Sequence, residues 1–252
     1  MLEVNSKPSA ENSRKVLVEP TNNESSLYYY QWVHNNIDEV SRQTDGRVGY
    51  IHIPDMGVSG LNEFAKYYYP QLTREGLIID VRGNGGGNVS PMIIERLMRK
   101  LTYMTMHTGQ QEGDPNPVGM QVGPKVTLLD KYSASDGDLF PYRFQVNEIG
   151  PTVGTRSWGG VVGYSGSIPL IDGGSIITPS YGPYDKDGKG WIIEGHGVVP
   201  DIIIENDPAE LYKGTDAQLN KAVEVVLEEL EKSPVKLPPI PPFPDKSGNK
   251  KK

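Results

Sequence analysis

The 252-residue sequence predicts an α/β fold, in which strands and helices alternate along the chain. Two observations carry this prediction. The stretch EGLIIDVRGNGGGN (75–88) is a short apolar run that ends in glycines and is followed by a helical pattern. The same order recurs about fifty residues later, where KVTLLD (125–130) leads into a turn of serines and acidic residues. We therefore expect both turns to open at the same edge of one sheet.

The first part of the chain contains four strand or helix signals before residue 75. Residues 1–14 are polar, and we expect them to be frayed. After them, apolar spacing and turn residues predict a lone strand in KVLVEP (15–20), a helix in SSLYYYQWVHNNIDEVSRQT (25–44), a strand in RVGYIHIPDM (47–56) and a helix in LNEFAKYYYPQL (61–72).

The later elements follow the same reasoning. VSPMIIERLMRKL (89–101) predicts a helix because Val89, Ile93 and Leu97 are aligned at helical spacing, while Pro141 is expected to kink or shorten the helix after the serine turn. Residues 150–207 are rich in glycine and predict hairpins that bridge the fold rather than another strand–helix unit. DAQLNKAVEVVLEELEK (216–232) is an amphipathic helix, and a proline-rich tail follows it.

The composition narrows the classes of function. A formal net charge of −7 argues against a nucleic-acid groove, which needs clustered Lys and Arg. The absence of cysteine excludes disulfides, thiol catalysis and Cys-ligated zinc, and no metal or cofactor is predicted. No apolar run approaches the ~20 residues of a membrane helix, and the N-terminus lacks the apolar core of a signal peptide. We therefore expect a cytoplasmic protein with no membrane partner.

The glycine turn lies where a phosphate loop could form, but its spacing is wrong. A dinucleotide motif read from Gly83 through Gly85 ends on Asn88 instead of glycine, and no Gly-Lys-Ser/Thr follows for a Walker loop. Glycines at the end of a strand still offer bare backbone N–H groups, which can stabilise an oxyanion in acyl transfer. The alternative is a tight strand–helix junction without a ligand.

The serine turn also has two interpretations. Ser135 at a strand–helix corner would expose its hydroxyl beside the first amides of the helix, as a nucleophile requires. Ser-Asp before a helix is equally typical of an N-cap. Asp136 and Asp138 either receive a basic side chain of a substrate or stabilise the start of the helix.

A serine nucleophile needs a base to take its proton, and the chain has four histidines. We expect His34 and His107 to be surface residues. His52 alternates with isoleucines in a strand, which is typical of a buried structural histidine. His196 lies in the turn EGHGV and is expected to be exposed.

Six segments resemble, in the same order, the C-terminal catalytic domain of tricorn-type proteases, members of the tail-specific or carboxy-terminal processing serine peptidases. They are GYIHIPDMG, GLIIDVRGNGGGNVS, YSASDGDLFPY, GTRSWGGVVG, LIDGG and WIIEGHGVVPDI. The likeness extends over residues 15–232. It implies a crotonase- or ClpP-like α/β fold of stacked β-β-α units.

The resemblance also implies roles for individual residues. The family's nucleophile lies in a Ser-Asp-Gly-Asp motif, which here is Ser135. Its oxyanion hole uses the backbone amide of the next residue, Asp136, and that of a loop glycine, either Gly86 or Gly87. A glutamate of the E-x-x-G-V-x-P-D-I stretch orients the catalytic histidine through a serine, and the matching residue is Glu194.

The general-base histidine of that family lies upstream of a PDZ-like domain, before the region that matches this chain. RKVLVEP resembles the last strand of that domain. A Ser-Lys dyad does not replace the histidine, because no lysine lies between Ser135 and Gln145. We therefore expect a disordered start and PDZ-like strand in 1–20, a peptidase core in 21–232 and a Pro- and Lys-rich disordered tail in 233–252.

The sequence thus predicts a serine peptidase core that hydrolyses peptides or unfolded polypeptides through an acyl-enzyme. As an isolated chain it is expected to be nearly inactive, because the base is missing. One alternative is a non-catalytic module that binds peptides or other ligands on the same fold. Another is a structural part of a homo-oligomer.

Overall fold

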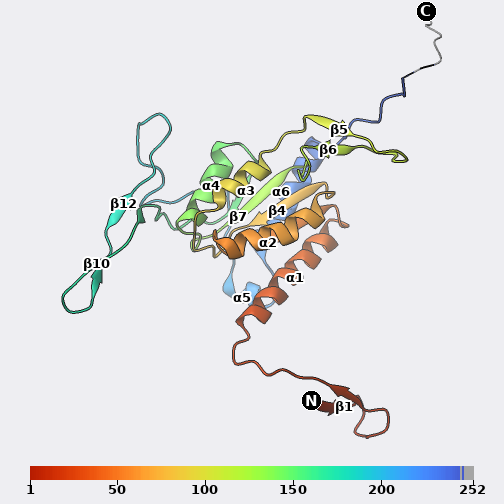
Figure 1. The fold of residues 1–252 in the computed structure, drawn as a ribbon, viewed down its shortest axis with the longest axis horizontal. Coiled ribbons are helices and arrows are strands. Elements are labelled where there is room, and N and C mark those ends of the chain that lie inside the picture. Colours follow the sequence, from red (N-terminus) through yellow and green to blue (C-terminus); the bar gives the residue numbers. More distant parts are fainter. Residues whose placement is uncertain (245, 247–252) are drawn as a thin grey trace, which may run out of the picture. The chain divides into compact units, whose positions relative to one another are not determined.

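The computed structural model of the protein describes residues 1–244 and residue 246, and it forms two compact units that meet between Asn35 and Asn36. In the first unit, β1 (Leu2–Val4) pairs antiparallel with β2 (Arg14–Val16) (Figure 1). Residues 2–4, expected to be frayed, therefore form a strand, and the strand predicted in KVLVEP is paired and begins earlier. Helix α1 (Ser25–Gln43) follows, where a helix was predicted.

A five-stranded parallel sheet forms the centre of the second unit. Its strands, in spatial order, are β13 (Ile202–Ile203), β8 (Thr152–Gly154), β7 (Lys125–Leu129), β4 (Gly76–Asp80) and β3 (Val48–His52). Every neighbouring pair is parallel. All residues of β3, β4 and β7 are buried, as the continuous apolar runs predict. The predicted α/β class is confirmed.

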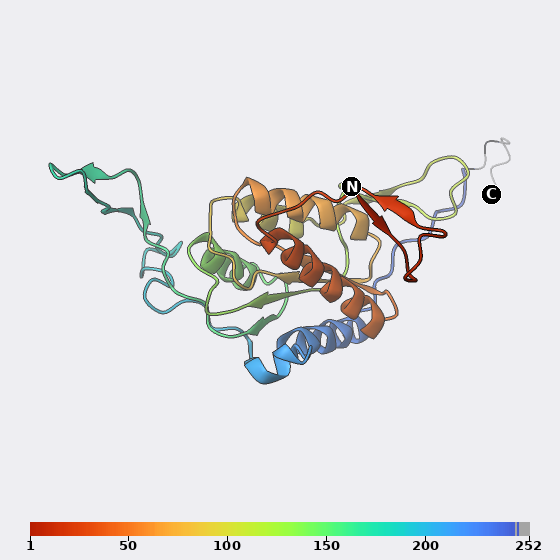
Figure 2. The same ribbon diagram turned by 90° about the horizontal axis from the view of Figure 1, so that it is seen from below.

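Helices cover both faces of this sheet (Figures 1 and 2). On one face, α2 (Val58–Tyr68), α3 (Ser90–Leu97) and α4 (Asp136–Val146) share a core with Ile51 and Ile79. On the other face, α6 (Ala217–Lys232) packs against alternate strand residues such as Tyr50 and Ile78. A short helix η1 (Tyr69–Gln71) extends α2, and α5 (Pro208–Tyr212) precedes α6.

Two helices show how the sequence fixes these faces. In α6, Leu219, Val223, Val226 and Leu230 form the buried stripe that the spacing predicts. The carboxylate of Asp216 caps α6 by accepting a hydrogen bond from the Leu219 amide at 2.9 Å. In α3, the aligned residues Val89, Ile93 and Leu97 are buried, and Pro91 lies in the first turn, both as predicted.

The region 150–207 corrects one prediction. It contains the expected hairpins, formed by β9 (Gly163–Tyr164) with β12 (Pro179–Tyr181) and by β10 (Ile168–Pro169) with β11 (Ser175–Ile176). However, β8 and β13 join the main sheet with no helix between them, so this region supplies two strands of the sheet as well as the hairpins. These two strands have three and two residues, too few to give a readable apolar pattern. The hairpin of β5 (Tyr103–Thr105) and β6 (Asp114–Asn116) was not predicted either.

Pro141 does not shorten α4, which continues to Val146, so the predicted shortening was wrong. A proline inside a helix costs ~3 kcal/mol through its missing N–H and its ring. Phe140 and Phe144 flank it and are fully buried. Each contributes about 1.5–3 kcal/mol by leaving water, so packing outweighs the local cost.

The proline-rich tail forms no helix or strand within the part of it that the structure describes, 233–244 and 246. Val235 nevertheless packs against the core on the α6 face, so the tail begins in contact with the fold. The rest of the predicted tail, residue 245 and residues 247–252, lies outside the described residues. In the described residues, no helix combines the length and the apolarity that crossing a membrane requires.

Candidate active site

Ser135 lies at the corner between β7 and α4 in an uncommon backbone conformation. Its φ of 56° and ψ of −121° are rarely adopted by a residue with a side chain, and such conformations cost of order 1–3 kcal/mol. Its side chain does not cap the helix. The expected capping hydrogen bond of Ser135 is therefore absent, and the corner resembles the strained strand-to-helix turn that carries the serine in α/β-hydrolases.

Small residues two positions before and after Ser135 make this corner possible. Ser133 is fully buried, and its hydroxyl donates to the carbonyl oxygen of Val81 at 2.9 Å. A Cβ atom on Gly137 would lie 2.2 Å from the carbonyl oxygen of Asn84. The spacing is that of the G-x-S-x-G corner of other hydrolases, with Ser133 in place of the first glycine. This spacing was a signal in the sequence that was not used in the predictions above.

The glycine loop after β4 is in direct contact with the serine corner. A Cβ atom on Gly86 would lie 2.6 Å from Cβ of Ser135 and 3.0 Å from the amide nitrogen of Asp136. With φ of 101°, Gly86 also has a backbone conformation that favours glycine. The two turns therefore meet at one edge of the sheet, as their positions after neighbouring strands predicted.

Two backbone amides at this contact have no acceptor among the described residues, and they belong to Gly87 and Asp136. The Gly86 amide, by contrast, donates to Oδ1 of Asn84 at 2.9 Å. Gly87 forms an isolated parallel bridge with Met56. In it, the Met56 N–H donates to the carbonyl oxygen of Gly86, and the Met56 carbonyl oxygen accepts from the amide of Asn88. The N–H of Gly87 consequently points away from Met56.

The carboxylates of Asp136 and Asp138 are both buried, and both accept hydrogen bonds from other residues of the protein. Asp136 accepts hydrogen bonds from the amide and hydroxyl of Ser90, at 2.9 and 2.6 Å, and pairs with Arg143 at 2.8 Å. Asp138 accepts from the two glycine amides at 159–160. Neither carboxylate is therefore available to a basic side chain of a substrate. They join α4 to α3 and to the loop after β8.

Glu194 lies close to the same corner. Its Oε2 accepts hydrogen bonds from the amides of Val161 and Val162, at 2.6 and 2.8 Å. The Ser135 amide donates to the carbonyl oxygen of Gly160 at 3.1 Å. Because that oxygen and the Val161 N–H belong to one peptide group, Ser135 and Glu194 bind opposite sides of the same group.

The histidines occupy different places. His52 is buried on the α6 face, its Nε2 lies 3.1 Å from the carbonyl oxygen of Arg82, and burial lowers its pKa. Ser135 begins a helix on the opposite face. His107 lies in the β5–β6 hairpin, 4.0 Å from Asp114. His196 is exposed, as predicted, with Nδ1 2.9 Å from the carbonyl oxygen of Glu194.

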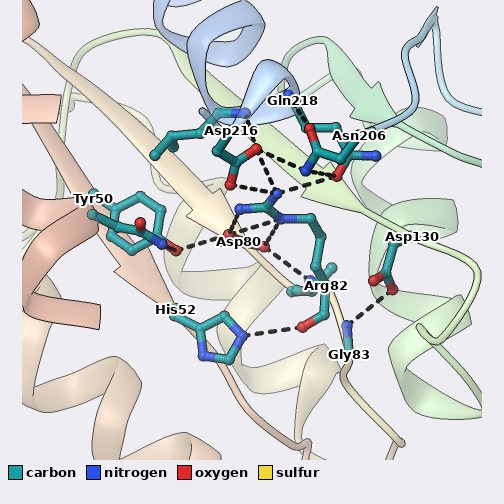
Figure 3. A network of polar contacts seen from close by, with 12 residues as sticks. Tyr50, His52, Asp80, Arg82, Gly83, Asp130, Asn206, Asp216 and Gln218 are labelled. Atoms are coloured by element: carbon teal, nitrogen blue, oxygen red, sulfur yellow. Dashed lines mark hydrogen bonds and ion pairs between the residues drawn. The ribbon is translucent and has the colours of Figure 1, made fainter. Parts of the chain in front are cut away.

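A buried charge network lies at the start of the glycine loop (Figure 3). The guanidinium of Arg82 contacts Asp80 at 2.6 Å and Asp216 at 2.8 Å, and the Tyr50 hydroxyl donates to Asp80 at 2.7 Å. Burial alone would raise the pKa of Asp80, but the charge of Arg82 outweighs it and the pKa is lowered. Burial and the charge of Asp80 raise the pKa of Tyr50 well above its usual value.

The sequence analysis did not identify this network, although charged residues at the end of the buried run LIIDVR were a signal. The structure shows that the network fixes Arg82, the residue directly before Gly83. In the described residues, no group of three or more His, Asp or Glu side chains is arranged to hold a metal ion.

A strained serine beside two amides without acceptors is typical of serine hydrolases. The model of peptidase family S41 matches residues 47–204, so the chain belongs to this family of peptidases. The matched region includes the glycine loop, Ser135 and Glu194. Within this family, the chain is similar to tricorn proteases and corresponds to a tricorn-type C-terminal protease domain.

Three relatives support this branch of the family. Tricorn protease of Thermoplasma volcanium is 43% identical over 226 residues, which cover 89% of this chain and 22% of that protein. A carboxy-terminal-processing protease of Bartonella bacilliformis is 24% identical over 204 residues, 74% of this chain and 45% of that one. A crystal structure of the tricorn protease has a TM-score of 0.80 at 37% identity, covering 87% of this chain and 21% of that chain. The chain thus spans about a fifth of the length of these tricorn proteases.

Proposed function

We propose that this chain is the catalytic core of a serine peptidase that hydrolyses peptides or unfolded polypeptides through an acyl-enzyme. The observation that carries the proposal is the contact between the glycine loop and the strained corner of Ser135, where a Cβ on Gly86 would lie 2.6 Å from Cβ of Ser135. This contact puts a serine hydroxyl and backbone amides without acceptors in one place. Membership of family S41 supports the same chemistry.

In the proposed mechanism, the hydroxyl of Ser135 attacks the carbonyl carbon of the scissile bond. The oxygen of that carbonyl becomes an oxyanion, which the N–H groups of Asp136 and Gly87 stabilise. Gly86 lines the site without a side chain. Of the two candidate glycines, Gly87 is favoured as the donor because the Gly86 amide is bonded to Asn84. The amino end of α4 adds its positive partial charge at the same point.

The proton of Ser135 has to reach a base, and we propose a histidine other than the four of this chain. His52 lies on the opposite face of the sheet, which supports this assignment. Glu194 is proposed to orient that histidine through a serine. Both hydrogen bonds that the Glu194 carboxylate accepts within the described residues use Oε2, which leaves Oε1 for such a partner.

Several wider features belong to the same proposal. They are the stacking of β-β-α units as in crotonase- and ClpP-like folds, a PDZ-like origin of the strand in 1–20, a peptidase core in 21–232, assembly into a homo-oligomer and a cytoplasmic location. The similarity to tricorn proteases supports the fold and the peptidase core among them.

Labelling with a fluorophosphonate tests the assignment of Ser135. In a protein that contains this chain together with the proposed histidine base, we expect a single adduct, detected by intact mass and located at Ser135 by peptide mapping. Ser135→Ala should gain none, whereas Ser165→Ala, which alters an exposed serine of the β9–β12 hairpin, should label as the unmodified chain does. An adduct that persists in Ser135→Ala would refute the proposal. Peptide binding without any labelling of the protein that includes the base would instead indicate a non-catalytic binding module.

Peptide hydrolysis by the isolated chain is expected to be slow. Removing the base of a catalytic triad leaves only the contributions of binding and the oxyanion hole, so the rate should lie at least roughly 10⁴-fold below that of an intact relative. A steady-state assay with an oligopeptide substrate measures this. Turnover close to that of the relative would show that one of the chain's own histidines acts as the base.

A further inference from the structure

Asn84 is a fully buried residue of the glycine loop that the mechanism above does not use. It joins three segments of the chain. Its Nδ2 donates to the carbonyl oxygen of Ile53 at 2.9 Å, and its Oδ1 accepts from the Gly86 amide at 2.9 Å. Its backbone oxygen accepts from the amide of Ala134 at 2.8 Å. Both hydrogen-bonding ends of the side chain are therefore satisfied inside the protein.

The first consequence concerns the direction of the Gly87 N–H. Asn84 fixes the amide of Gly86, and Met56 donates to the carbonyl oxygen of Gly86 at 2.8 Å. In a trans peptide the carbonyl oxygen and the N–H of the next residue point in opposite directions. With both ends of Gly86 fixed, the N–H of Gly87 is turned away from Met56.

The second consequence concerns the distance between the two turns. Ala134 directly precedes Ser135, so its bond to the carbonyl oxygen of Asn84 holds the serine corner against the glycine loop. The same oxygen would lie 2.2 Å from a Cβ on Gly137, which shows how closely the first turn of α4 approaches it. Asn84 thus contacts both turns that supply the proposed oxyanion donors.

The start of the loop is fixed independently. The Gly83 amide donates to Oδ1 of Asp130 at 2.9 Å (Figure 3). The same oxygen accepts from the Tyr132 amide at 3.0 Å. Arg82 is held by its two carboxylate partners. Because residues 82–83 are anchored in this way, the side chain of Asn84 acts on the part of the loop that follows, Gly86 and Gly87.

We propose that Asn84 is the positioning residue of the oxyanion hole: it sets the direction of the Gly87 N–H relative to that of Asp136 without touching the substrate. The proposal rests on the proposed function. It explains the residue type, because a short planar amide supplies one donor and one acceptor. An ionised aspartate would lack the donor for Ile53 and would place negative charge beside the oxyanion.

A pair of matched ligands separates positioning from structure. A peptide boronic acid forms a tetrahedral anion on a serine hydroxyl, whereas the same peptide ending in a carboxamide binds without forming one. We expect Asn84→Ala in the 252-residue chain to weaken boronate binding by about 10- to 100-fold, part of the effect of losing one oxyanion donor. Binding of the carboxamide should stay within about twofold.

Thr127→Val is the control, because it removes a buried hydrogen bond, from Thr127 to the carbonyl oxygen of Ile79 at 2.9 Å, in the same sheet. Both affinities should survive this change. If Asn84→Ala loses boronate and carboxamide binding equally, or loses neither while still folded, the role of Asn84 is overturned. The proposed function would not be affected by that outcome. A wild-type chain that forms no boronate adduct at Ser135 would overturn the proposed function together with it.

Amide NMR of the wild-type chain tests the inference even if Asn84→Ala fails to fold. On formation of the boronate adduct, the amide protons of Gly87 and Asp136 should shift downfield, because they now bond an anion. The Gly86 amide proton should keep its shift, because it remains on Asn84. A Gly86 amide that shifts with the adduct would overturn the assignment.

Discussion

Two polar regions occupy the same end of the same strands but opposite faces of the sheet. On the α6 face, Arg82 is enclosed by Asp80 and Asp216, so the buried charges compensate one another. On the α4 face, Ser135 has a strained backbone and the amide of Asp136 has no acceptor among the described residues. Saturated polar groups hold a fold together, whereas unsatisfied and strained ones indicate a ligand. By this comparison, the Arg82 network belongs to the scaffold and the Ser135 corner to the candidate site.

The largest expected effect tests the scaffold. Arg82→Met would leave Asp80, which is 0% exposed, without its counter-ion, and should destabilise the protein by about 3–5 kcal/mol. Urea unfolding measures this difference. Adding Asp80→Asn should recover part of the loss, because the buried charge disappears with its partner. A loss below about 1 kcal/mol in the single variant would mean that the network does not hold the fold.

The next effect tests the site. Gly86→Ala should slow fluorophosphonate labelling by about 10²-fold, because its methyl group would displace Ser135 from the oxyanion donors. Gly85→Ala is the matched control: Gly85 has no positive φ, and nothing lies within 4 Å of an added Cβ. Equal labelling rates of the two variants would contradict the proposed contact between loop and corner.

A third prediction concerns Lys125, a buried residue of β7 that bonds only backbone oxygens, those of Gln121 and Gly123. Burial lowers its pKa from 10.5 to about 8. Between these values the unfolded chain binds a proton that the folded chain does not, so stability should rise with pH from about 8 to 10.5. The gain is at most about 3 kcal/mol.

Comparing the wild-type chain with Lys125→Met isolates this titration from all others. The difference in unfolding free energy between the two proteins should change over that pH range in favour of the wild type. Denaturant unfolding at several pH values provides the curves. Parallel curves would show that Lys125 titrates normally.

The smallest effect tests the strain at the corner. Ser135→Gly removes the side chain that makes a φ of 56° unfavourable, whereas Ser135→Ala keeps a Cβ. The glycine variant should be more stable than the alanine variant by about 1 kcal/mol, after the entropy of glycine in the unfolded chain is subtracted. Thermal unfolding of both variants, neither of which can label, checks this. An alanine variant of equal or higher stability would refute stored strain.

The sequence predicted what depends on local pattern. The buried strands around Ile78 and Val126, the stripe of α6 and the meeting of two turns at one sheet edge all follow from apolar spacing and chain order. The choice between an N-cap and a nucleophile at Ser135 did not, because both use serine before an acidic helix start. Only the backbone angles of the folded chain separate them.

Contacts between distant residues also escaped prediction. Arg82 and Asp216 are 134 positions apart, and no spacing in the sequence indicates that they pair. Asn84 was passed over for a similar reason, since its three partners come from three segments. Pro141 shows the opposite error, in which a strong local rule was overridden by the packing of Phe140 and Phe144.

The hairpins from β9 to β12 follow directly after residues 159–162, whose backbone amides are hydrogen-bonded by carboxylates of the candidate site. Just before them, Asp138 holds the two glycine amides at 159–160, and Glu194 holds those of Val161 and Val162. Glu194 also lies just beyond the far end of the insertion. Because these hydrogen bonds hold the chain on both sides of residues 163–191, the contacts around Ser135 do not depend on the length of the hairpins between them.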